Sequence, residues 1–162
     1  MKLIAMVALV TLMLSGCASN RHHASGVELR ASIKVEESER ISSVAREQCG
    51  VENMVEKYLE KHADLSDTTI KMVEPTDAGH GLRLKIEIGG ISGGGFSVSR
   101  LDVVSTIGFY AELREEGKVI ARTSKTCSVG ARIGFDYNAC ERLDEAADCV
   151  GAYANKWVNK FL

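Results

Sequence analysis

Apolar and polar residues alternate along three segments of the chain. Between residues 27 and 35 the odd positions are apolar and the even positions are polar or charged, which predicts a half-buried strand. Residues 82–88 and 101–114 alternate in the same way. The turn residues 115–118 separate 101–114 from a strand-like run at 119–126, so these two segments predict a β-hairpin.

Two other segments carry apolar residues at intervals of three and four, which is the spacing of one helix face. The first predicts a helix over 51–63, or one that begins near Ile41 and has Gly50 as a weak point. The second predicts a helix over about 139–161 whose stripe must be buried, most simply against a sheet. That stripe consists of Cys140, Leu143, Ala147, Val150, Ala154, Trp157 and Phe161.

The region between the two predicted helices contains one more strand and a glycine run. Residues 68–74 predict a strand that Pro75 ends, and the turn residues after it predict a hairpin with 82–88. Five glycines between residues 89 and 95 then interrupt the alternation. We expect a flexible loop at 89–95, because a glycine-rich chain is conformationally loose.

The expected order of elements is strand, helix, three or four antiparallel strands and helix. This order predicts an α+β fold, with one mostly antiparallel sheet of about four to five strands. We expect the two helices to pack on one face of that sheet, after an N-terminal signal helix.

The amino terminus combines one positive charge with a short apolar run. Lys2 precedes twelve mostly apolar residues, 3–14, whereas a helix needs about 20 to span a bilayer. Such a run, followed by small residues, is typical of a secretory signal peptide. A buried core helix is the alternative, but it is disfavoured because polar residues do not recur periodically within 3–14.

The residues that follow the apolar run, Leu14-Ser15-Gly16-Cys17, resemble the lipobox of bacterial lipoproteins. The resemblance implies that the Cys17 thiol receives diacylglycerol, that the chain is cut before Cys17, and that the new amino terminus is acylated. Stable anchoring needs more than one acyl chain such as palmitate, and a triacylated Cys17 meets that need. Ala18 stands where an aspartate would retain the protein at the inner membrane, which implies the periplasmic face of the outer membrane.

These observations divide the chain into three parts. We expect a signal peptide at 1–16, a lipidated tether at 17–25 and a single α+β periplasmic domain at 26–162. The chain carries 20 Lys and Arg against 22 Asp and Glu, a formal net charge of −2, without a basic stripe. Nucleic acid is therefore not an expected partner.

Four cysteines follow Cys17, and an even number in an exported chain indicates two disulfides, because the periplasm is oxidising. In a continuous helix Cys140 and Cys149 lie about 13.5 Å apart along the axis, too far for a bridge. The remaining pairings are Cys49–Cys140 with Cys127–Cys149, or Cys49–Cys149 with Cys127–Cys140. We slightly favour the second, because the polar segment 128–139 could close easily.

Ser92, within Gly90-Ile91-Ser92-Gly93-Gly94, matches the pattern of a nucleophile elbow. That elbow needs a helix after the strand, whereas here another strand follows, and the nearest histidine, His80, lies upstream. The glycine run also lacks the Gly-Lys-Ser/Thr ending of a phosphate-binding loop. We therefore expect neither catalysis by Ser92 nor a cofactor site.

Two other groups of chemically active residues are expected to be solvated. His22 and His23 lie in the tether without a cysteine or acid at ligand spacing, so no metal site is expected. The acidic pairs 36–37 and 115–116 lack a second titrating group that would separate their pKa values, as catalytic carboxylates need. We interpret both pairs as surface residues.

The layout over 49–161 is similar to that of small cell-envelope lipoproteins of uncharacterised function. The similarity rests on Cys49 before the first helix, the run GGGFS, the segment 117–120 (GKVI), and a last helix that bears cysteine and ends near a tryptophan in NKWVNKF. Such proteins have no established activity to carry over.

The sequence therefore favours a non-enzymatic, membrane-anchored lipoprotein of the envelope, an outer-membrane accessory or protein-binding module. The alternative is a small-ligand or lipid-binding auxiliary component of a transport system. In that case Val103, Ile107 and Phe109 would line a groove, provided that the last helix leaves them uncovered.

Overall fold

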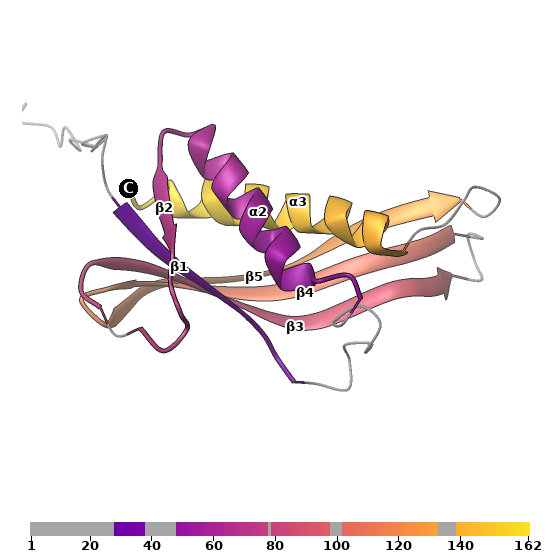
Figure 1. The fold of residues 1–162 in the computed structure, drawn as a ribbon, viewed down its shortest axis with the longest axis horizontal. Helices are drawn as coiled ribbons and strands as arrows, with labels where there is room; N and C mark the ends of the chain where they lie inside the picture. The colour runs from indigo at the N-terminus through magenta and orange to yellow at the C-terminus, as the bar shows by residue number, and fades with distance from the viewer. Residues whose placement is uncertain (1–27, 38–47, 78, 98–101, 133–138) are drawn as a thin grey trace, which may run out of the picture.

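The structure, a computed structural model, describes residues 28–37, 48–77, 79–97, 102–132 and 139–162. The expected signal helix and Cys17 lie outside these residues. Figure 1 shows the elements, which in chain order are β1 (Glu28–Val35), α2 (Val51–Asp64), β2 (Thr69–Met72), β3 (Leu82–Ser97), β4 (Asp102–Glu115), β5 (Lys118–Arg132) and α3 (Ala139–Val158).

The strands form one sheet in the order β2-β1-β3-β4-β5. The α+β class is confirmed, but the expectation of a mostly antiparallel sheet is wrong. β1 runs parallel to both β2 and β3, whereas β3–β4 and β4–β5 are antiparallel. The cause is α2, which carries the chain back along the sheet so that β2 starts beside the start of β1, as crossover helices do between parallel strands.

The expected hairpin between 68–74 and 82–88 is also wrong. β1 separates β2 from β3 in the sheet. Residues 73–81 return the chain to the starting end, and β3 then enters beside β1 with Leu84 opposite Ala31. The parallel direction of β3 follows from this return.

We had expected the glycine run at 89–95 to form a loop between strands, and this expectation is wrong. β3 continues through it to Ser97, and Gly90, Ile91 and Ser92 are paired with residues of β4. Two irregularities in the register, at Ile88/Gly90 and Ser92/Gly95, absorb the extra residues, as β-bulges do. Glycine thus changes the shape of the strand without ending it.

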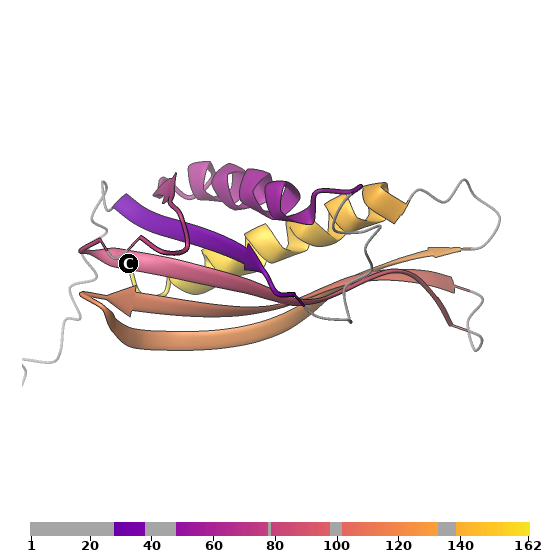
Figure 2. The ribbon, with the colours of Figure 1, turned by 60° about the horizontal axis from the view of Figure 1, so that its bottom comes forward.

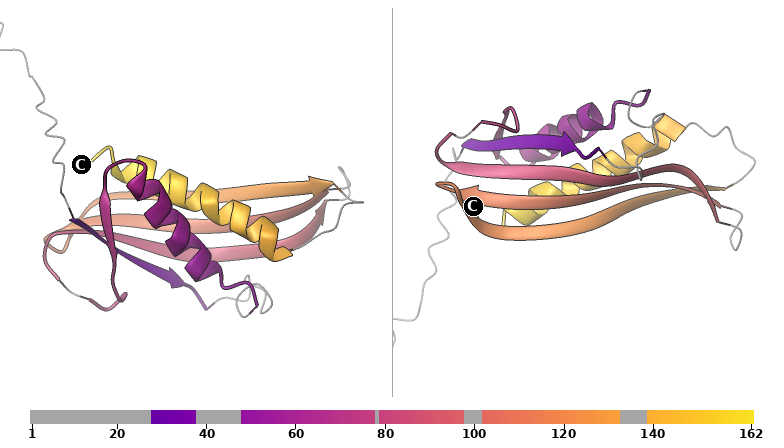
Figure 3. Two further views of the ribbon diagram at one scale, coloured as in Figure 1. Left: turned by 45° about the horizontal axis from the view of Figure 1, so that its top comes forward. Right: turned by 90° about the horizontal axis from the view of Figure 1, so that it is seen from below.

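Both helices cover the same face of the sheet (Figures 2 and 3). Their predicted starts are confirmed: α2 begins directly after Gly50, whose φ of 59° suits glycine, and α3 begins at Ala139. α3 ends at Val158, earlier than the predicted end near residue 161. An earlier start of the first helix falls on residues outside the described part of the chain. Within that part, neither helix is long and apolar enough to cross a membrane.

α2 and α3 approach each other very closely at Gly151. A Cβ atom at that position would lie 2.6 Å from the backbone carbon of Tyr58, so only glycine fits without a shift of the helices. Polar contacts flank the crossing: the His62 ring lies 3.0 Å from Asp148, and Asn155 donates to the His62 carbonyl oxygen at 2.7 Å. The helix layer is therefore specified by both shape and hydrogen bonding.

Candidate functional site

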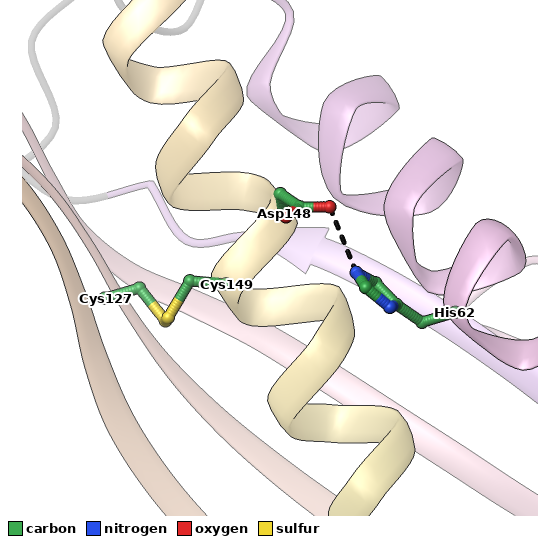
Figure 4. The surroundings of a disulfide bond; sticks show 4 residues. All are labelled: His62, Cys127, Asp148 and Cys149. Atoms are coloured by element: carbon green, nitrogen blue, oxygen red, sulfur yellow. Dashed lines mark hydrogen bonds and ion pairs between the residues drawn. A yellow bond between two sulfur atoms is a disulfide. The ribbon is translucent and has the colours of Figure 1, made fainter. Parts of the chain in front are cut away.

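The four cysteines of the domain form two disulfides. Cys49 is bonded to Cys140 and Cys127 to Cys149, with Cα–Cα distances of 5.1 and 5.9 Å. Figure 4 shows the second bridge between β5 and α3. It also shows the contact between Asp148 and His62 of α2, on the side of α3 that faces α2. Two disulfides are confirmed, but the pairing that we favoured is the wrong one of the two left open.

The length of β5 explains the pairing. Segment 128–139 is not all loop, since β5 runs on to Arg132 and carries the chain about 17 Å past Cys127. α3 then returns over the sheet, and the nine residues from Cys140 to Cys149 cover about 13.5 Å of helix axis. Cys149 is thus brought back over Cys127, while Cys140 lies beside Cys49 at the start of α2.

The second face of the sheet carries no helix in the described structure, and we call it the open face (Figure 2). In β4 it presents the even-numbered residues, from Thr106 through Tyr110 to Arg114, while odd-numbered residues such as Ile107 and Phe109 are buried under the helices. The alternation predicted from sequence therefore separates a covered apolar face from an open polar face.

The centre of the open face is hollowed. Gly90 of β3 lies directly opposite Gly108 of β4, and Gly108 lies opposite Thr126 of β5. The resulting depression, which we call the glycine depression, measures about 690 Å³. It is lined by Glu36, Glu87, Gly89, Gly90, Gly108, Phe109, Tyr110, Ser124, Lys125 and Thr126.

The fold itself does not require glycine at position 108. Gly108 has no positive φ, and a Cβ atom there would lie 3.7 Å from the Gly90 carbonyl oxygen and from Thr126 Oγ1, an ordinary contact. A Cβ atom at Gly90 would meet no atom of the described residues within 4 Å. Glycine inside a strand without such reasons often marks a site where a ligand or another backbone approaches closely.

A buried carboxylate lies on the open face near the glycine depression. Glu112 is 5 % exposed, and its oxygens accept hydrogen bonds from Arg114 and, at 3.0 Å, from Arg122. Burial alone would raise the pKa of Glu112, but the two arginines outweigh burial and hold that pKa below its ordinary value. Sequence reasoning missed this group, because Glu112 falls on the polar side of the alternation.

A second concavity lies between α3 and β5, next to the Cys127–Cys149 bridge. It measures about 460 Å³, and the Lys125 ammonium lies 4.3 Å above the centre of the Tyr153 ring. Among the described residues, the lining contains three lysines and two aromatic rings but no acid. It comprises Lys125, Cys149, Ala152, Tyr153, Lys156, Trp157 and Lys160, and we call it the lysine groove.

The structure keeps Ser92 apart from the nearest histidine in the sequence. His80 precedes β3, whereas Ser92 is exposed near the middle of that strand, and ten residues of strand span about 33 Å. His80 instead contacts Glu116 at 3.2 Å. This contact and the Gly81 N–H bond lower the pKa of Glu116.

The remaining residues singled out in the sequence lie in different parts of the chain. His22 and His23 lie outside the described residues. Both acidic pairs are exposed, as expected, but Glu36 lies at the edge of the glycine depression. Among the described residues, histidine, cysteine and acids do not gather in threes in a way that could hold a metal ion.

The groove proposed for a ligand on the basis of 103–109 is not open. Ile107 is fully buried and Phe109 is 4 % exposed, with its ring packed edge-to-face against Tyr153 of α3 at 6.0 Å. α3 therefore fills the space that a ligand would need. The side chain of Val103 lies outside the described part.

No known family model matches this sequence, and no curated protein sequence matches it. Solved structures nevertheless share the fold. A crystal structure from Xanthomonas campestris, of a protein in a family of unknown function, has a TM-score of 0.58 at 15 % identity and covers 82 % of each chain. A minor lipoprotein from Acinetobacter baumannii has a TM-score of 0.54 at 8 % identity over 81 % of this chain and 90 % of that chain. The fold is thus one that a bacterial lipoprotein adopts.

Proposed function

We propose that this chain is a non-enzymatic lipoprotein of the bacterial envelope whose open face binds an envelope protein. Acyl chains on Cys17 would hold it at the periplasmic face of the outer membrane. The lipobox-like residues 14–17 and the occurrence of this fold in a lipoprotein support the anchored state. The glycine depression is the observation that carries the binding role.

The chemistry of the open face suits contact with another protein. Several of its charges are already paired within the domain, as between Lys85 and Glu87 at 2.6 Å and between Glu112 and its two arginines. A partner that covers these pairs would not leave either charge of a pair without its counter-charge, which makes desolvation less costly. The glycine floor allows a partner backbone to approach the sheet, and the surrounding Tyr110, Ser124 and Thr126 hydroxyls can exchange hydrogen bonds with it.

Site-specific photocrosslinking in intact host cells tests this proposal. A photoreactive residue at Ser124, on the open face, should give a discrete crosslinked protein. The same residue at Glu60, exposed on α2 in the helix layer, is the matched control and should not give that product. Equal products from both positions, or none from Ser124, would overturn the binding role, and an unacylated Cys17 in mass spectra would overturn the anchored state.

The lysine groove supports a second candidate function, the binding of a small anionic ligand by an auxiliary component of a transport system. Three ammonium groups around an aromatic wall suit an anion with an apolar portion. Native mass spectrometry of the protein from its host should then show a bound anion, which Lys125→Gln with Lys156→Gln removes. A ligand-free spectrum for the unchanged protein would count against this candidate.

A further inference from the structure

Several elements begin or end at one end of the sheet, which we call the anchor end. β1 begins there, and Thr69 at the start of β2 lies opposite Glu28. β3 begins beside β1 and meets the turn between β4 and β5. The end of α3 lies there too, as the contact between Thr68 and Asn159 shows: the Thr68 hydroxyl donates to the Asn159 side chain at 3.1 Å. In Figure 1 these ends lie together on the left, with the C-terminus.

All large apolar side chains that are exposed in the described structure lie at the anchor end. Leu65, between α2 and β2, is 75 % exposed, and Phe161, after α3, is 46 % exposed. Val119 and Ile120, directly after the β4–β5 turn, are 37 % and 44 % exposed. Exposed apolar residues gathered in one region mark contacts with membranes or proteins.

Aromatic rings and lysines accompany these residues. Trp157 and Phe161 form an edge-to-face pair at 5.5 Å, and Lys156 and Lys160 lie beside Trp157 in the lysine groove. Of the two rings only that of Phe161 is exposed, since Trp157 is buried. An exposed aromatic ring favours the boundary between lipid and water, and lysine keeps its ammonium in water while its stem lies on apolar surface. Acidic residues such as Glu116 share this end, so charge alone does not select a lipid.

The position of Cys17 indicates what the anchor end faces. Cys17 lies eleven residues before Glu28, where β1 begins, and eleven extended residues reach about 40 Å at most. An acylated Cys17 therefore keeps the anchor end, rather than the far end of the sheet, close to the bilayer. At such a high effective concentration even a weak apolar contact becomes populated.

We infer that the anchor end docks on the lipid surface, with Leu65, Ile120 and Phe161 in the headgroup region. This inference rests on the proposed acylation of Cys17. The strands then stand away from the bilayer, and the open face is turned toward proteins of the envelope instead of toward lipid. The apolar residues supply most of the attraction, so the docking should depend little on salt.

Trp157 provides the readout, because it is the single tryptophan of the chain and, although itself buried, contacts the exposed ring of Phe161. The full lipidated protein is reconstituted in phosphatidylcholine vesicles, with and without bromine in the upper acyl chain. Bromolipid should quench Trp157 emission in the unchanged protein. The triple variant Leu65→Ser, Ile120→Ser, Phe161→Ser should lose this quenching while its melting temperature shows an intact fold.

Two further variants keep the test decisive. Leu65→Ser with Ile120→Ser leaves Phe161 against Trp157, and it should lose part of the quenching without a change in the local environment of the ring. Ser128 is exposed in β5, far from the anchor end. Ser128→Ala is therefore the control, and its Trp157 emission should be quenched as in the unchanged protein. Absent quenching with acylated Cys17, or full quenching of the triple variant, would overturn the inference alone. A mass spectrum without acyl chains would instead overturn the proposed function.

Discussion

Two glycines, one in the helix layer and one in the sheet, are present for different physical reasons. At Gly151, in the helix layer, an added Cβ atom would lie 2.6 Å from the Tyr58 backbone. At Gly108, in the sheet and lining the open face, the nearest atoms to such a Cβ would lie 3.7 Å away. The first glycine is required by packing within the chain, whereas the second has no internal requirement.

The difference separates stability from binding. Protein interiors are close-packed, so on the covered side of the sheet the available space determines which residue fits at each position. The open side has room, so a glycine there needs an explanation outside the chain, and the proposed protein partner supplies one. Substitutions on the two sides of the sheet can test this division, because their expected effects on stability differ widely.

The largest effect is expected from loss of the disulfide that joins the starts of the two helices. Cys49→Ala with Cys140→Ala removes a crosslink between residues 91 apart, and the chain-entropy account gives a loss of about 4–5 kcal/mol in unfolding free energy. Cys127→Ala with Cys149→Ala, 22 residues apart, should cost about 3 kcal/mol. Urea unfolding measures both losses, and the reverse ranking would contradict the chain-entropy account for this domain.

The next effect is expected from Gly151→Ala. The new methyl group must push α2 away from α3, and overpacking of this kind costs about 1–3 kcal/mol, partly offset by the higher helix propensity of alanine. The unfolding free energy should therefore fall by about 1–2 kcal/mol. Unchanged stability would show that the helix crossing is looser than the structure indicates.

Glu112→Gln should have a smaller effect that depends on pH. The pKa of Glu112 is lowered in the folded state, so its ionised form stabilises the fold above the ordinary carboxyl pKa, and this contribution is lost as the pH falls through the folded pKa. At neutral pH the variant should lose about 1 kcal/mol, because both arginines remain partly hydrated.

The control for this prediction is Glu116→Gln. The pKa of Glu116 is also lowered, but its side chain is 62 % exposed, so solvent screens its contacts. Unfolding should be followed from neutral pH to below pH 4.5, the ordinary carboxyl value. Glu112→Gln should flatten the acid limb of the stability curve more than Glu116→Gln does, and equal curves would contradict the role assigned to Glu112.

Local patterns predicted the elements well but not their arrangement. Alternation and helical spacing identified 51–63 and 101–114 almost to the residue, because one face of each element is buried and the other solvated. The direction of β1 relative to its neighbours depends on the route of the connections. That route is a property of the assembled sheet and leaves no periodic trace in the sequence.

The candidate site was largely hidden for a related reason. Glycine weakens a strand when considered alone, so the run at 89–95 was interpreted as a loop, whereas pairing with β4 overrides that preference. Gly108 lies within a predicted strand and gave a signal that could have been used. Only the register places it opposite Gly90, and the hollow arises from that pairing.

The smallest effect on stability, and the sharpest test of the comparison, is expected from Gly108→Ala. Because the backbone of Gly108 and the space around it accept a methyl group, the unfolding free energy should stay within about 0.5 kcal/mol of the unchanged protein or rise slightly through a less flexible unfolded chain. Crosslinking from Ser124 in cells should nevertheless weaken, since the methyl group fills the floor of the glycine depression.

Gly108→Leu should abolish that crosslink. Thr106→Leu, at a neighbouring position of the open face in the same strand, is the matched control for added bulk. If both leucine variants keep the crosslink, the partner does not approach Gly108, and its glycine has no role in binding. If Gly108→Ala instead destabilises the protein as much as Gly151→Ala, both glycines serve packing. The division between the two sides of the sheet would then be wrong.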